Sequence, residues 1–89
     1  MEAYMAVLRV EPVEVRTIGR VIATITGIDP TDGDLFVGYL QGTQYAMTPA
    51  RWDNSGYYRD HDSICNLDLR SLEFQDLLKT ARLIGALAA

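Results

Sequence analysis

Residues 21–40 read VIATITGIDPTDGDLFVGYL, and this stretch decides the fold. Its first part is rich in Val, Ile and Thr, which favour the pleated, half-buried surface of a β-strand. Residues 29–34 are nearly all turn-forming, and the apolar run of residues 35–40 follows them. The pattern predicts two antiparallel strands joined by a tight turn. Gly38, inside the second strand, predicts a β-bulge or a sharp bend.

Strand patterns continue on both sides of this pair. Residues 13–17 alternate apolar and polar side chains with a period of two, as a strand with one solvated face does. Residues 52–58 read WDNSGYY, and turn-forming residues between aromatic ones predict a β-hairpin. Because proline cannot donate a ladder hydrogen bond, Pro12 limits how far the first strand can run as a central strand. The other predicted strands cover residues 3–10, residues 44–52 and residues 64–69.

The end of the chain has a helical pattern. Ser71 is a suitable N-cap for a helix over residues 72–87, within a helical region of residues 71–88. An apolar stripe with the 3.6-residue period predicts the face that packs on the sheet: Phe74, Leu77, Leu78, Ala81 and Ile84. We therefore predict an α+β fold, with a small curled antiparallel sheet or partly open barrel of five to six strands and one C-terminal α-helix.

The composition indicates a single domain over residues 1–89, with a β-rich part at residues 1–69. Hydrophobic residues make up 48% and charged residues 22% of the chain, close to the average of globular proteins. The net charge is −4, and the basic residues are scattered along the sequence. We expect no nucleic-acid partner, because sequence-independent binding needs clustered Lys and Arg.

The sequence also predicts a cytoplasmic location. Cys65 is the one cysteine, so an intramolecular disulfide is impossible and a reducing compartment is expected. The N-terminal residues lack the basic start and long apolar run of a secretory signal. The apolar tail of residues 83–89 is far shorter than the roughly 20 residues of a membrane span, so we expect no membrane partner.

One group of residues has the chemistry of a catalytic or metal site. Asp60, His61 and Asp62 are adjacent, and Cys65 follows closely. Histidine changes its charge near neutral pH, and neighbouring carboxylates raise its pKa. Zinc needs three or four converging ligands, however, and the sequence has no second histidine. The simpler interpretation is a solvated loop with no metal and no cofactor, and Cys65 as a small buried hydrophobe.

Two further motifs are better explained by structure than by ligand binding. The acidic run of residues 29–34 has some of the residues of a calcium loop, but Pro30 and Leu40 break the EF-hand spacing. The glycines form no phosphate-binding pattern between a strand and a helix. Neither motif predicts a bound ion or nucleotide.

Apolar residues outside the predicted core indicate a surface for a ligand or partner. Leu72, Leu83 and Leu87 lie off the main stripe of the predicted helix. A domain of this size covers two apolar faces poorly, and pairing about a two-fold axis is the commonest solution. We therefore expect a homodimer. The predicted surface also includes the aromatic residues of the last hairpin, Trp52, Tyr57 and Tyr58.

Two functions follow from these observations. The first is a non-enzymatic binding or adaptor domain for an unidentified protein or small-molecule ligand, because spare apolar surface accompanies no converging catalytic set. The alternative is a small hydrolase or metal-assisted enzyme that uses His61 with neighbouring carboxylates. Convergence of these side chains into one pocket would favour the enzyme.

The order of the motifs resembles a class of known proteins. A Gly-Arg pair between strands, an acidic turn, the sequence Trp-Asp-x-x-Gly-Tyr-Tyr and a late Leu-Asp-Leu are similar to small uncharacterised proteins carried by phages and integron gene cassettes. The resemblance implies a β-barrel-like sheet. It implies no catalytic residue, because most of those proteins have no known activity. The residues that carry it are Gly19-Arg20, Trp52-Asp53, Gly56-Tyr57 and Leu67-Asp68-Leu69.

Overall fold

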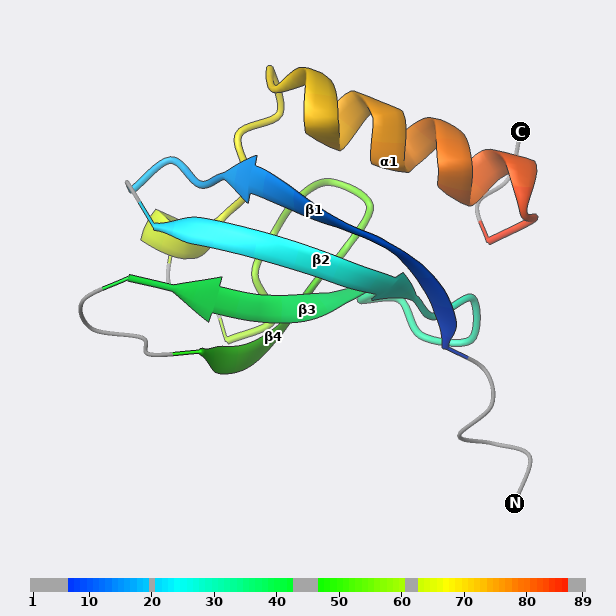
Figure 1. Cartoon of the computed structure of the whole chain (residues 1–89), viewed down its shortest axis with the longest axis horizontal. Helices are drawn as coiled ribbons and strands as arrows, with labels where there is room; N and C mark the ends of the chain where they lie inside the picture. Colours follow the sequence, from blue (N-terminus) through cyan, green and yellow to red (C-terminus); the bar gives the residue numbers. More distant parts are fainter. Residues whose placement is uncertain (1–6, 20, 43–46, 61–62, 87–89) are drawn as a thin grey trace.

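An antiparallel sheet of four strands and one C-terminal α-helix make up the fold, which confirms the α+β prediction. The computed structural model describes residues 7–19, 21–42, 47–60 and 63–86. The curved, open sheet has α1 along its β1 side (Figure 1). The elements are β1 (Leu8–Arg16), β2 (Ile22–Ile28), β3 (Phe36–Gln41), β4 (Thr48–Trp52), the 3₁₀-helix η2 (Ser63–Cys65) and α1 (Leu72–Leu83).

The strands follow one another in sequence order, each antiparallel to the next. The β2–β3 pair matches the prediction from residues 21–40. Its connection is closed by a hydrogen bond of 2.7 Å from the N–H of Asp29 to the carbonyl oxygen of Leu35. The Asp29 carboxylate accepts two more hydrogen bonds, from the N–H and the hydroxyl of Thr31. Short polar side chains thus form the turn, as their sequence indicates.

The first strand differs from the prediction at Pro12. Two separate strands were expected, whereas β1 continues through the proline with a register shift between Arg9 and Val13. The strand order places β1 at an edge of the sheet. An edge strand tolerates proline, because half of its N–H groups have no partner strand.

The described residues contain four strands rather than five or six. Tyr58 forms only an isolated bridge with Trp52, and Leu67 only one with Thr17. On either side of the Trp52 bridge, the N–H groups of Asp53 and Arg59 donate to the carbonyls of Tyr57 and Arg51. The N–H of Tyr58 donates instead to Oδ1 of Asn66, at 2.9 Å. The structure does not describe residues 3–6 or 44–46, so the predicted strands are untested over those positions.

The core lies between the inner face of the sheet and α1. The rings of Phe36 and Phe74 meet edge to face, with their centroids 5.7 Å apart, and so join β3 to the helix. Ile84 differs from the predicted stripe, because it lies beyond the last helical residue and is 42% exposed. The largest fully buried side chains are Trp52, Phe36, Phe74, Ile25, Ile28, Leu40, Leu67, Val15 and Cys65.

The helix begins as predicted and ends earlier. The Ser71 hydroxyl accepts a hydrogen bond of 3.1 Å from the N–H of Phe74, which is N-cap geometry. At the other end, Gly85 has a φ of 80° and its N–H donates to the carbonyl of Arg82. The N–H of Ala86 donates to the carbonyl of Ala81. This pair of bonds is a Schellman motif, which glycine favours because it has no Cβ.

Gly38 lies where two strands approach each other closely. A Cβ atom at this position would overlap the carbonyl oxygen of Thr24. The register shift occurs in the facing strand, between Ile25 and Gly27. The predicted irregularity is therefore present, and it belongs to β2. No helix in the described part of the chain is long and apolar enough to cross a membrane.

Candidate functional site

Two of the predicted surface aromatics, Trp52 and Tyr58, belong to the core. The side chain of Trp52 is fully buried, and its Nε1 atom donates a hydrogen bond of 2.8 Å to the carbonyl oxygen of Cys65. Tyr58 is also buried, and its ring centroid lies 6.0 Å from that of Trp52. This corrects the expectation that both side chains form a partner surface. The chain after β4 folds back against Trp52 and encloses both rings.

The other predicted partner residues are exposed but do not form one apolar face. Tyr57 is 61% exposed, and Leu72 and Leu83 are 76% and 86% exposed at opposite ends of α1. The two leucines are about three turns apart and share one side of the helix. Asp76 and Lys79 lie between them on that side, and both are exposed. Charged side chains therefore interrupt the predicted helix surface.

Three predicted site residues, His61, Asp62 and Leu87, lie outside the residues that the structure describes. Asp60 is described and exposed, and Cys65 is a buried residue of η2. Among the described residues, no three His, Cys, Asp or Glu side chains come together as a metal site would require. The hypothesis of a hydrolase centred on His61 stays a prediction.

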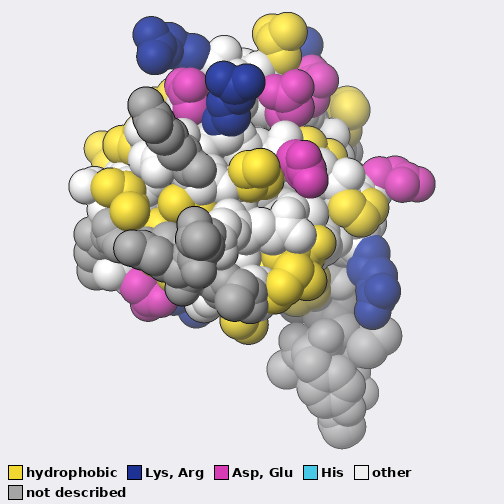
Figure 2. All heavy atoms as spheres, turned by 60° about the vertical axis from the view of Figure 1, so that its left-hand side comes forward, with side chains coloured by type: hydrophobic (Ala, Val, Ile, Leu, Met, Phe, Trp, Pro, Cys, Tyr) yellow, Lys and Arg dark blue, Asp and Glu magenta, His cyan; other side chains and the backbone are white. Residues whose placement is uncertain are grey.

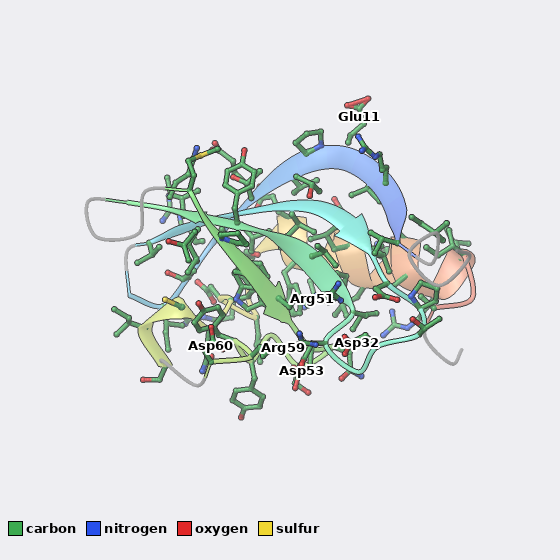
Figure 3. All side chains as sticks on the ribbon, turned by 90° about the horizontal axis from the view of Figure 1, so that it is seen from below. Glu11, Asp32, Arg51, Asp53, Arg59 and Asp60 are labelled. Atoms are coloured by element: carbon green, nitrogen blue, oxygen red, sulfur yellow. The ribbon has the colours of Figure 1, made fainter. Side chains whose placement is uncertain are left out.

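A charged cluster that the sequence analysis missed joins the β2–β3 turn to β4. Nη1 of Arg51 lies 3.1 Å from an oxygen of Asp29 and 3.3 Å from one of Asp32. Nitrogens of Arg59 lie 2.6 Å from Asp32 and 2.7 Å from Asp34. Figure 3 shows Asp32 beside Arg51 and Arg59. The arginines are 19 to 27 residues from these carboxylates in sequence, so no local pattern indicates the cluster.

Two carboxyl groups of this cluster, Asp29 and Asp32, have lowered pKa values. The hydroxyl and the N–H of Thr31 are the main causes that lower the pKa of Asp29, although desolvation opposes them. The N–H of Asp34 and then the guanidinium of Arg59 lower the pKa of Asp32. The hydrogen bonds that Arg59 donates to Asp34 and then to Asp32 raise the pKa of Arg59 in return. A carboxyl with a lowered pKa is a poor proton carrier near neutral pH, so the cluster is suited to fastening the turn.

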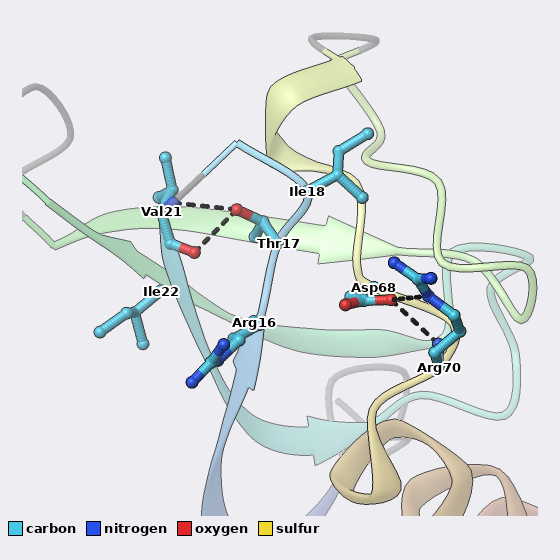
Figure 4. Close-up of a pocket in the computed structure, with 7 residues that line it drawn as sticks. All are labelled: Arg16, Thr17, Ile18, Val21, Ile22, Asp68 and Arg70. Carbon is cyan, nitrogen blue, oxygen red and sulfur yellow. Dashed lines mark hydrogen bonds and ion pairs between the residues drawn. The ribbon is translucent and has the colours of Figure 1, made fainter.

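A hollow of about 440 Å³ lies at the end of the β1–β2 hairpin (Figure 4). Ile18 and Ile22 line it from the hairpin, and Arg16 projects beside them from the end of β1. Asp68 and Arg70 line it from the segment that precedes α1. The hollow therefore combines apolar walls with charged groups from two distant parts of the sequence.

Hydrogen bonds hold these two segments together. The Thr17 hydroxyl donates to the carbonyl oxygen of Val21 at 2.7 Å and accepts from the N–H of Val21 at 3.0 Å. The N–H of Asp68 donates to the carbonyl oxygen of Arg16 at 2.8 Å, next to the bridge between Thr17 and Leu67. The hairpin end is thus fixed in shape before any ligand binds, which lowers the entropy lost on binding.

A second hollow, of about 320 Å³, adjoins the first and shares Ile18, Asp68 and Arg70 with it. Tyr57 and Leu69 line its other side. Ile18 is 62% exposed and Leu69 is 51% exposed, so apolar side chains stand in solvent at both hollows. Figure 2, which turns this end of the molecule forward, shows hydrophobic side chains at its surface. We define the hairpin-end surface by six residues that line these hollows: Arg16, Ile18, Ile22, Tyr57, Leu69 and Arg70.

Two arginines and one aspartate, Asp68, line the two hollows, although the chain as a whole has a net charge of −4. Arg16 forms no ion pair with any described residue. Arg70 lies 3.6 Å from Asp68 and its side chain is almost fully exposed. An exposed pair of this length contributes little, so both guanidinium groups remain open to a ligand. The surface is suited to binding apolar groups that carry carboxylates.

No protein-family model, curated protein or solved structure matches this chain. The assignment of function therefore rests on the chemistry of its own residues. One sequence signal was available for the hairpin-end surface: Ile18 stands next to the Gly19-Arg20 pair between two predicted strands, and an apolar side chain in a connection is commonly exposed. No local sequence pattern indicates that Ile18 lies close to Leu69 and Arg70.

Proposed function

We propose that this chain is a non-catalytic interaction domain that binds a protein partner through the hairpin-end surface. The observation that carries the proposal is the pair of adjoining hollows, where exposed apolar side chains stand beside two arginines. Tyr and Arg are enriched at the residues that dominate binding energy in protein interfaces, and Tyr57, Arg16 and Arg70 supply both types.

The preferred partner segment is apolar and carries carboxylates. Ile18 and Ile22 offer apolar area that leaves water on contact. The planar guanidinium of Arg16 binds a carboxylate through two parallel hydrogen bonds. Asp68 offsets part of the positive charge near Arg70. Apolar contact therefore supplies most of the affinity, and charge selects the partner.

The proposal includes self-association as a homodimer in the cytoplasm, as the sequence leads us to expect. The exposed apolar side chains of a chain of 89 residues support self-association, because small domains cover apolar surface poorly. The single, buried thiol of Cys65 supports a reducing compartment. The resemblance to proteins of mobile genetic elements remains part of this proposal.

A titration of isotope-labelled protein with short peptides, followed by NMR, tests the proposed binding. One peptide alternates Leu and Glu, and its matched control alternates Leu and Lys. We expect saturable shifts of the amides of Ile18, Ile22 and Leu69 with the acidic peptide. The basic peptide should bind at least about fivefold more weakly, which corresponds to about 1 kcal/mol.

Two variants make this titration specific. Arg16→Glu reverses a charge inside the surface and should weaken binding of the acidic peptide. Arg9→Glu reverses an exposed charge on the same strand, outside both hollows, and should leave the affinity nearly unchanged. An equal loss in both variants would reduce the effect to net charge and would contradict the proposal. The absence of any saturable shift would also contradict it.

A further inference from the structure

A third hollow, of about 300 Å³, lies between α1 and β1. Its floor is apolar, because Leu77 is buried there and Val10 and Val13 are half-buried. We name it the acidic groove, since the charged side chains that line it are Glu11, Glu73 and Asp76.

No described residue neutralises these three carboxylates. None of them forms an ion pair in the described part of the chain. Glu11 projects away from the sheet, as Figure 3 shows, and all three side chains are exposed. Like charges around one groove repel each other and attract a cationic surface. The groove therefore fits a partner that is both apolar and basic.

The hairpin-end surface of a second copy has this chemistry. We propose that the two surfaces bind each other in a two-fold symmetric dimer, an inference that rests on the proposed function because it names the partner of the hairpin-end surface. Ile18 and Ile22 of one copy face the apolar floor of the acidic groove, and Arg16 and Arg70 face its carboxylates. The pairing supplies the apolar, acidic partner that the hairpin-end surface requires.

Both surfaces include residues of β1. Val10 and Val13 line the acidic groove from the first part of the strand, and Arg16 reaches the hairpin-end surface from its last residue. In the proposed two-fold arrangement, the hairpin end of each copy lies against the groove of the other. Each contact then forms twice, and neither surface remains free to extend the assembly.

A charge exchange between the two surfaces tests this dimer. The hairpin variant is Arg16→Glu with Arg70→Glu, and the groove variant is Glu73→Lys with Asp76→Lys. All four positions are exposed, so both variants should fold, which circular dichroism checks. Sedimentation equilibrium should show wild type approaching twice 9.9 kDa. Each variant alone should dissociate with a constant raised about tenfold or more, because like charges then face each other.

Mixing the two variants is the decisive measurement. In a mixed dimer, arginines face glutamates at one contact and glutamates face lysines at the other, so dimerisation should return. Wild type that stays monomeric as concentration rises, or a mixture that stays monomeric, would overturn the inference. Leu83→Glu serves as the control, because Leu83 lies outside both surfaces. A dimer that Leu83→Glu weakens and the groove variant does not would also overturn it.

Peptide binding by the groove variant distinguishes a failure of the dimer from a failure of the proposed function. The groove variant keeps an intact hairpin-end surface, so it should still bind the Leu/Glu peptide. Peptide binding together with monomeric wild type would leave the proposed function standing and remove the dimer. Failure of the peptide to bind this variant would instead remove the proposed function.

Discussion

Nε1 of Trp52 donates a hydrogen bond of 2.8 Å to the carbonyl oxygen of Cys65, inside the core. This bond joins the end of β4 to η2 and closes the loop between them over the sheet. The one tryptophan of the chain is therefore a structural residue. A buried indole N–H needs a partner, and a carbonyl in a short 3₁₀-helix needs one too, so each satisfies the other.

Trp52→Phe should destabilise the fold. The substitution removes the hydrogen bond that Trp52 donates to the Cys65 carbonyl and part of a fully buried ring system. We expect the free energy of unfolding to fall by about 2–4 kcal/mol. Urea unfolding followed by far-ultraviolet circular dichroism measures the loss. Tyr57→Phe is the control and should change stability by less than about 0.5 kcal/mol, since Tyr57 is exposed.

Leu77→Ala should test how α1 packs on the sheet. Leu77 is buried against the core, so truncation should cost about 2–5 kcal/mol of unfolding free energy. Leu78 is only partly buried, so Leu78→Ala should cost less. Leu83→Ala should have nearly no effect, because that side chain is exposed. Equal effects of Leu77→Ala and Leu83→Ala in denaturant unfolding would show that the helix is oriented differently.

Gly85→Ala should weaken the end of α1. Gly85 has a φ of 80°, where a Cβ atom is strained, although no atom lies close enough to clash with it. We expect a loss of about 1 kcal/mol in unfolding free energy. Gly33→Ala is the matched control: its Cβ also meets no neighbour, and its φ is not in the left-handed region. A similar loss at both glycines would contradict the Schellman motif as the cause.

The acidic turn should make stability depend on pH. The pKa values of Asp29 and Asp32 are lowered by folding from an ordinary value of 3.8. Such groups stabilise the folded state above the unfolded pKa, and this contribution is lost as the pH falls through the folded pKa. Urea unfolding at a series of pH values should therefore show stability declining below about pH 4.

Thr31→Val should reduce this dependence at one carboxyl. The hydroxyl of Thr31 is the largest cause of the lowered pKa of Asp29, so its removal should raise that pKa toward 3.8. NMR titration of the Asp29 carboxyl measures the change. Thr31→Ser retains a hydroxyl and should keep the pKa low. An unchanged pKa of Asp29 in Thr31→Val would assign the shift to another group.

His61→Ala should leave the fold and the oligomeric state unchanged. The sequence places His61 in a polar loop between carboxylates, and the non-catalytic proposal gives it no role. Circular dichroism and sedimentation of the variant check both properties. Elemental analysis of wild type and His61→Ala, both purified without chelator, measures any bound metal. A stoichiometric metal in wild type that disappears in His61→Ala would support the metal-assisted alternative.

Local signals predicted much of the secondary structure, and they failed at the end of α1 and after β4. The N-cap at Ser71 is confirmed, and the β2–β3 hairpin is confirmed too. The end of α1 was missed although Gly85 marks it, because the apolar run continues past it in sequence. The predicted strand that begins at Tyr57 is not confirmed, because Tyr58 forms only an isolated bridge with Trp52.

The sequence by itself determined the α+β class, the antiparallel hairpin at residues 21–40 and the start of the helix. Each depends on residues within one turn or one strand of each other, where periodicity, caps and turn formers act directly. Only the tertiary structure decided that Trp52 donates to the carbonyl of Cys65 and that Arg16 and Arg70 line one hollow with Ile18. These arrangements join segments far apart in the chain, and the burial of the whole core, rather than any local preference, selects among them.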